Sequence, residues 1–141
     1  GGINAKVNNI ETDFFFFKDI NKTFDYYTPI LIANNDFLAS NPDAAKAFLS
    51  ATAKGYEYAI SNPEKAAQIL IDGDDTKSLV GSEALVVESQ KWMADQYVAD
   101  APKWGYIDPA RWNAFYNWLG EEKIVEEKIP ENTGFTNDYL A

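Results

Sequence analysis

The chain has 141 residues, of which 46% are hydrophobic and 24% charged, a composition typical of a folded globular domain. Its net charge of −10 argues against nucleic acid and anionic membrane surfaces as partners, because both would repel an acidic protein. The sequence contains neither cysteine nor histidine, which excludes disulfides, thiolate metal sites and catalytic dyads or triads that need these residues.

The first third of the chain predicts short strands. The run Phe14–Phe17 is too short for a helix and consists of a residue that favours strands, and Tyr27–Ala33 is a second short apolar run. We expect both to be strands buried on two faces, as in a sheet that is covered by helices.

From residue 40 onwards the sequence predicts helices. Three of them start with a capping residue followed by proline, at Asn41-Pro42, Asn62-Pro63 and Asp108-Pro109. The expected helices span residues 42–60, 63–71, 78–98 and 109–119, and Gly120 is the expected cap of the last one. Trp92 and Trp112 lie on the apolar faces of these helices and are expected in the core, whereas Trp104 fits either core or rim.

Two strands cannot close a sheet, so we expect these helices to cover a sheet that lies mostly outside this polypeptide. The chain also opens with Gly1-Gly2 instead of Met, so either its N-terminus was processed or it is part of a longer protein, and we favour the second interpretation. The apolar runs are all far shorter than the roughly 20 residues needed to cross a bilayer, so no transmembrane segment is expected in this chain.

The segment Asp25–Pro29 is the candidate ligand site. It places Tyr26 and Tyr27 at the start of an expected strand, and ligands often bind at strand ends in sheets covered by helices. Packing of the tyrosine pair at a strand edge is the alternative interpretation.

The sequence indicates no catalytic residue, no metal site and no cofactor. The acidic turn Asp72–Asp75, with Glu83 at the twelfth position, resembles a calcium loop only superficially. Lys77 occupies the position that requires glycine, and Val80 occupies a usual ligand position, so a solvated turn between two helices is expected.

Several segments together resemble the C-terminal half of solute-binding proteins for thiamine-pyrimidine precursors. In chain order they are Phe24–Asn34, Phe37-Leu38, Asn41-Pro42, Lys54–Ile60, Asn62–Glu64, Ala101–Gly105, Asp108–Trp118 and Gly134–Asn137. This resemblance implies an α/β, helix-rich chain that forms part of a type 2 periplasmic-binding-protein fold. Residues 1–39 would supply the end of the second lobe and a crossing strand, and residues 40–141 the C-terminal helical part, as a single segment of a two-lobe protein.

The resemblance also implies a function. The protein would be the extracytoplasmic solute-binding component of an ABC importer, in the periplasm or as a bacterial cell-surface lipoprotein. It would bind hydroxymethyl- or formylamino-pyrimidine by lobe closure and deliver it to an ABC permease, without being an enzyme. Most ligand contacts of the family would precede residue 1. A pyrimidine synthase-like enzyme on the same fold and a stand-alone helical interaction domain are the alternatives.

Overall fold

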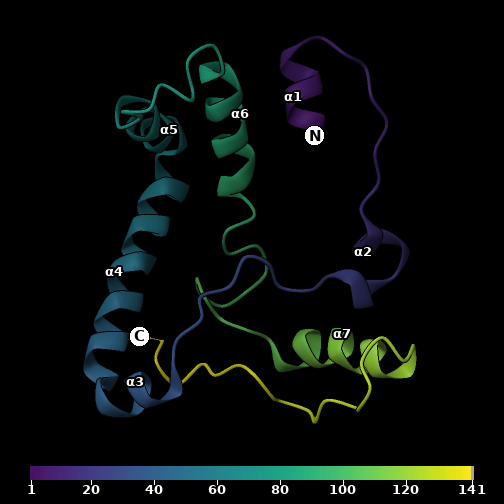
Figure 1. Ribbon diagram of the computed structural model, residues 1–141. Helices are drawn as coiled ribbons and strands as arrows, with labels where there is room; N and C mark the ends of the chain where they lie inside the picture. Colours follow the sequence, from purple (N-terminus) through teal and green to yellow (C-terminus); the bar gives the residue numbers. More distant parts are fainter. Residues whose placement is uncertain (141) are drawn as a thin grey trace. The chain divides into compact units, whose positions relative to one another are not determined.

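The computed structural model describes residues 1–140, and those residues form helices and irregular segments without any strand. The helices are α1 (Gly2–Val7), α2 (Phe17–Ile20), the 3-10 helix η1 (Lys22–Phe24), α3 (Asn35–Ser40), α4 (Pro42–Ser61), α5 (Pro63–Asp72), α6 (Glu83–Ala94) and α7 (Pro109–Glu121) (Figure 1). The helix-rich character expected from the sequence is therefore confirmed.

The chain divides into two compact units. Unit 1 consists of residues 1–14 and 51–104, and within it α6 packs against α5 and α1. Its interior includes Ala67 and Ala94, together with the amide side chain of Gln90. A stack of Tyr56 on Trp104, with ring centroids 4.7 Å apart, adds an aromatic contact to this unit.

Unit 2 consists of residues 15–50 and 105–140 among those described, and in it α7 packs against η1. Trp112 on α7 is its largest buried side chain and is 6% exposed. The indole Nε1 donates to the carbonyl of Thr133 at 2.9 Å, and the ring contacts Tyr116 and Phe135. The C-terminal segment is thereby held against α7.

The helices begin where the sequence predicted, at Pro42, Pro63 and Pro109, but their caps differ. The carboxylate of Asp108 accepts from the Ala110 amide at 3.0 Å, as expected for an N-cap. Asn41 and Asn62 instead donate their side-chain amides to a carbonyl of the preceding helix, at 3.4 and 3.3 Å. Each asparagine follows the end of one helix and precedes the start of the next. Its side-chain amide therefore donates a hydrogen bond to a free carbonyl in the last turn of the earlier helix.

Two other helix boundaries differ from the prediction. The expected helix over residues 78–98 is shorter, because the residues after α5 form turns and α6 begins only at Glu83. The expected cap at Gly120 is wrong, since α7 continues to Glu121 and the positive φ of 55° belongs to Lys123.

The predicted strands are wrong. The residues of the Phe14–Phe17 run are between 42% and 69% exposed, and Phe17 begins α2. In the second run, Ile30, Leu31 and Ile32 are 45%, 57% and 87% exposed. Both segments have the composition of strands, but a strand needs a neighbouring strand to satisfy its amides, and none of the described residues supplies one.

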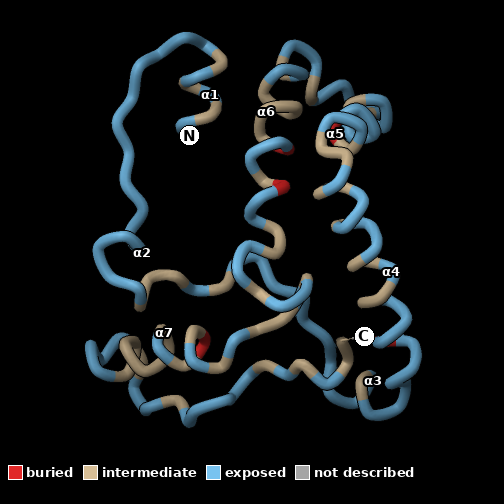
Figure 2. The backbone as a smooth tube through the Cα atoms, turned by 180° about the vertical axis from the view of Figure 1, so that it is seen from behind, coloured by how far each residue is buried: buried red, intermediate tan, exposed pale blue. Residues whose placement is uncertain are grey.

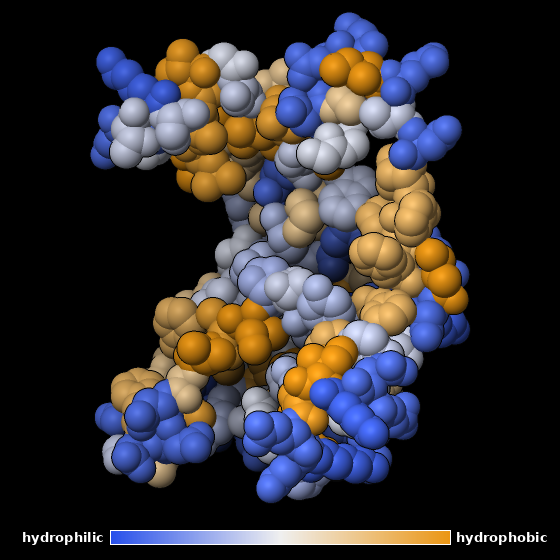
Figure 3. Space-filling model, turned by 45° about the vertical axis from the view of Figure 1, so that its right-hand side comes forward, coloured by the Kyte–Doolittle hydropathy of each residue, from blue (hydrophilic) through white to orange (hydrophobic). Residues whose placement is uncertain are grey.

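Buried residues are few in the described part of the chain and lie scattered over the helices (Figure 2). Large apolar side chains reach the surface in several separate patches (Figure 3). Trp92 belongs to this exposed set at 45%, so its expected place in the core is wrong, whereas that of Trp112 is confirmed. The expectation that the helices cover further polypeptide stays a prediction.

Candidate functional site

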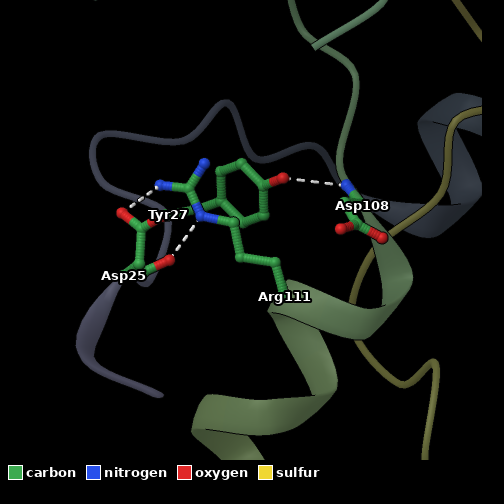
Figure 4. A network of polar contacts seen from close by, with 4 residues as sticks. All are labelled: Asp25, Tyr27, Asp108 and Arg111. Carbon is green, nitrogen blue, oxygen red and sulfur yellow. Dashed lines mark hydrogen bonds and ion pairs between the residues drawn. The ribbon is translucent and has the colours of Figure 1, made fainter. Parts of the chain in front are cut away.

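The segment that contains Tyr26 and Tyr27 is fixed to the first turns of α7 by an arginine. Arg111 donates from Nε to the backbone carbonyl of Asp25, and from Nη2 to the Asp25 carboxylate at 2.9 Å (Figure 4). Both side chains are about a third exposed, at 31% and 36%. A fork that binds one backbone and one side-chain oxygen of the same residue fixes the position of this segment in unit 2.

Tyr27 is held by the same group. The guanidinium carbon of Arg111 lies 4.2 Å from the centroid of its ring, in cation–π geometry. Its hydroxyl accepts from the backbone amide of Asp108 at 2.8 Å, in the network that Figure 4 shows. Since a phenol both accepts and donates, the O–H of Tyr27 retains the capacity to donate to a further acceptor.

Tyr26 is oriented differently. Its ring stacks on Phe115 of α7, with centroids 4.5 Å apart and planes at 25°, while 46% of the residue is exposed. Phe115 in turn contacts Tyr116 and Trp118, so α7 carries a continuous series of aromatic rings. An aromatic ring that is supported on one face and partly exposed is suited to stacking a flat ligand.

Together these groups offer stacking and directed hydrogen bonds. Arg111 has five N–H donors, of which the bonds to Asp25 use two. A flat heterocycle with acceptor atoms matches this combination of an aromatic face, a guanidinium and a phenol. The sequence prediction named both tyrosines but missed Arg111, although it is the single arginine among 12 basic residues.

The acidic turn after α5 lies between two helices, as expected. The Asp74 carboxylate accepts from the hydroxyls of Thr76 and Ser78 at 2.7 and 3.1 Å, and from the Leu79 amide at 2.6 Å. These hydrogen bonds, that of Thr76 foremost, lower the pKa of Asp74 below its usual 3.8. The carboxylate thus stabilises the turn itself. Residues 1–140 contain no cluster of three or more acidic groups arranged to hold a metal ion.

Clefts in unit 1 border helix α6. One, of about 490 Å³, lies between α5 and α6, and the other, of about 820 Å³, lies between α6 and residues 2–14. The larger one is lined by the rings of Phe14 and Trp92 and by the charged groups of Lys6, Glu11 and Lys91.

None of the described helices combines the length and the apolar character that a membrane span requires.

Residues 1–66 match the model of the family described as NMT1/THI5 like. A curated relative is the formylaminopyrimidine-binding protein of Halalkalibacterium halodurans, which is 22% identical over 113 residues. The match covers 80% of this chain and 34% of the relative, so the chain spans about a third of the relative's length. Tyr26 and Tyr27 lie inside the family match, whereas Arg111 lies beyond it. The resemblance seen in the sequence is confirmed: over residues 1–66 this chain is similar to the NMT1/THI5-like family.

Proposed function

We propose that this chain is part of an extracytoplasmic solute-binding protein that delivers a thiamine pyrimidine precursor to the permease of an ABC importer. The observation that carries the proposal is the similarity to a protein named for binding formylaminopyrimidine, and the match of residues 1–66 to the NMT1/THI5-like family model supports it. The expected type 2 periplasmic-binding-protein fold belongs to the same proposal. The chain supplies the end of one lobe, a crossing segment and the C-terminal helices.

In this proposal Tyr26 and Tyr27 contact the ligand in different ways. The ring of Tyr26 stacks on one face of the aminopyrimidine. Phe115 packs against the other face of the Tyr26 ring, as it already does in this structure. Tyr27 donates its O–H to a ring nitrogen or a formyl oxygen, since its hydroxyl accepts from the Asp108 amide and is thereby oriented. Arg111 acts as a positioning residue that holds the segment.

Ligand binding would favour a closed arrangement of two lobes, because the ligand then contacts both lobes and is shielded from water. A neutral aminopyrimidine fits a protein of net charge −10 better than an anionic solute does. The permease would recognise the closed form. We place the protein outside the cytoplasm, in the periplasm or as a lipoprotein at the cell surface.

A thermal-shift panel on the protein as the organism makes it tests the proposal. Formylaminopyrimidine or hydroxymethylpyrimidine at 100 times its Kd is expected to add about 2.7 kcal/mol to the free energy of unfolding. Riboflavin and taurine are the comparison solutes and are expected to shift nothing. Stabilisation by one of these, with none by the pyrimidines, would contradict the ligand assignment.

The binding and enzyme alternatives differ in the origin of the pyrimidine, because a synthase-like enzyme would form it, whereas a binding protein only takes it up. Mass spectrometry after incubation of the protein in cell extract should find no increase in the amount of pyrimidine if the protein is a binding protein. An increase that depends on the protein would establish the pyrimidine synthase-like alternative. Absence of stabilisation by any solute would favour the stand-alone interaction domain.

Two substitutions test the tyrosines. Tyr26→Leu removes a stacking contact worth about 0.5–1.5 kcal/mol, which corresponds to a loss of affinity of roughly two- to tenfold. Tyr58→Leu is the matched control, because Tyr58 is 45% exposed and lies in unit 1. Tyr27→Phe keeps the ring over which Arg111 lies and removes only the hydroxyl. Unchanged affinity in both Tyr26→Leu and Tyr27→Phe would show that these residues do not contact the ligand.

A further inference from the structure

A side chain from the C-terminal segment binds both backbone groups of Ile107, shortly before α7. Asn137 Oδ1 accepts from the Ile107 amide at 3.0 Å, and Asn137 Nδ2 donates to the Ile107 carbonyl at 2.8 Å. Both residues are half-buried and belong to unit 2. This paired contact resembles the exchange of hydrogen bonds between two strands, and it fixes the Ile107 backbone relative to the C-terminal segment.

The Ile107 carbonyl belongs to the same peptide group as the Asp108 amide. A trans peptide group is planar and rigid, and its C=O and N–H point in opposite directions. The N–H end of this group donates to the Tyr27 hydroxyl at 2.8 Å (Figure 4). Asn137 therefore holds one end of a rigid plane whose other end binds Tyr27.

These contacts form a directional series of hydrogen bonds. Asn137 Nδ2 donates to the Ile107 carbonyl, the Asp108 amide donates to the Tyr27 oxygen, and the Tyr27 O–H remains free to donate further. Successive hydrogen bonds polarise one another, which strengthens each by about 10–30% in a medium of low dielectric constant. The series thus strengthens the Tyr27 hydroxyl as a donor as well as orienting it.

The backbone around Asn137 is itself held in place. The Leu140 amide donates to the Asn137 carbonyl at 3.2 Å. Gly105 has a φ of +83°, and a Cβ at this residue would lie 3.0 Å from the Leu140 side chain. Glycine at residue 105 therefore allows the C-terminal segment to approach the chain shortly before α7, where Asn137 reaches Ile107.

We propose that Asn137 is a positioning residue of the ligand site, which orients the Tyr27 hydroxyl through the peptide group between Ile107 and Asp108 and strengthens it as a donor to the pyrimidine. This inference rests on the proposed function, in which Tyr27 contacts the ligand. Because the Tyr27 oxygen already accepts from the Asp108 amide, its hydroxyl selects ligands that present an acceptor at this point.

Isothermal titration calorimetry with formylaminopyrimidine, on the protein as the organism makes it, tests the inference. Asn137→Leu removes both hydrogen bonds at a similar side-chain size, and we expect a loss of affinity of roughly two- to tenfold, as for one net hydrogen bond. Asn137→Asp is the second variant, because it retains the acceptor for the Ile107 amide and loses only the donor; a similar loss of affinity is expected.

Asn113→Leu is the matched control. Asn113 lies on α7 and also binds the C-terminal segment through two hydrogen bonds, but its partner is Asn132, at 2.8 and 3.0 Å. We expect its affinity for formylaminopyrimidine to be unchanged. In ligand-free protein, the Asp108 backbone amide observed by NMR should exchange faster with solvent in Asn137→Leu and in Tyr27→Phe, but not in Asn113→Leu.

The Tyr27→Phe background separates positioning from a general loss of structure. Without the hydroxyl, Asn137→Leu should lower the affinity no further, whereas the effects of independent sites would add. Absence of pyrimidine binding by the unaltered protein would overturn the proposed function together with this inference. Unchanged affinity in Asn137→Leu and Asn137→Asp, or an equal loss with and without the Tyr27 hydroxyl, would overturn the inference alone.

Discussion

Truncation of Trp112 to alanine is expected to lower the free energy of unfolding by about 3–5 kcal/mol. The side chain is 6% exposed, its Nε1 donates to the Thr133 carbonyl at 2.9 Å, and Tyr116 and Phe135 lie against its ring. Alanine would leave a closed cavity and an unpaired carbonyl. Trp112→Phe keeps most of the ring and loses the indole N–H, so we expect a smaller cost of about 1–2 kcal/mol.

Trp92 is the matched control, since it is also a helical tryptophan but remains 45% exposed. Its truncation removes about half as much buried surface and opens no closed cavity, which gives a cost of about 1–2 kcal/mol. Urea unfolding followed by far-ultraviolet circular dichroism measures both variants without relying on tryptophan emission. If Trp112→Ala and Trp92→Ala lower the free energy of unfolding by the same amount, within about 0.5 kcal/mol, the conclusion that Trp112 is central to the core of unit 2 is wrong.

Three further predictions concern polar contacts. Arg111→Met should lower the free energy of unfolding by about 2 kcal/mol in the same urea assay, with Arg111→Lys in between, because lysine provides a single point charge instead of a fork. The lowered pKa of Asp74 means that its contribution to stability is complete above pH 3.8 and is lost as the pH falls through the lower folded-state value. Acid titration followed by circular dichroism should therefore show a loss of helical signal below pH 3.8, and this loss should be smaller in Asp74→Asn. Glu64→Gln breaks the 2.8 Å ion pair with Lys91, in which the side chain of Glu64 is 70% exposed and that of Lys91 41%. Because water and salt screen such an exposed pair, neither this substitution nor the addition of 1 M salt should shift the urea midpoint appreciably.

The sequence predicted the long helices well because their signals are local. A proline at the first helical position and a polar residue before it identify the starts at Pro42, Pro63 and Pro109 without any tertiary information. The same local signals could not show what the side chains of Asn41 and Asn62 bind. Each lies between two successive helices, and its amide serves the earlier one.

The candidate site was only half visible in the sequence. Tyr26 and Tyr27 attract attention as neighbours, but the residue that fixes their segment, Arg111, lies 86 positions after Asp25. The burial of Gln90 was missed for a different reason. A glutamine within an amphipathic helix gives no sign of its burial until the helix that faces it is known.

The failed strand predictions follow from the same difference between local and distant interactions. Every internal hydrogen bond of an α-helix joins residues four apart, so a continuous segment contains all that it needs to form one. A strand satisfies its amides only with another strand, so Phe14–Phe17 and Tyr27–Ala33 can have strand composition without forming strands. Their exposed phenylalanine and isoleucine side chains fit the proposal that the complete protein provides a sheet for them. The segment with Tyr26 and Tyr27 keeps its place because Arg111 and Asp108 hold it through polar contacts that need no sheet.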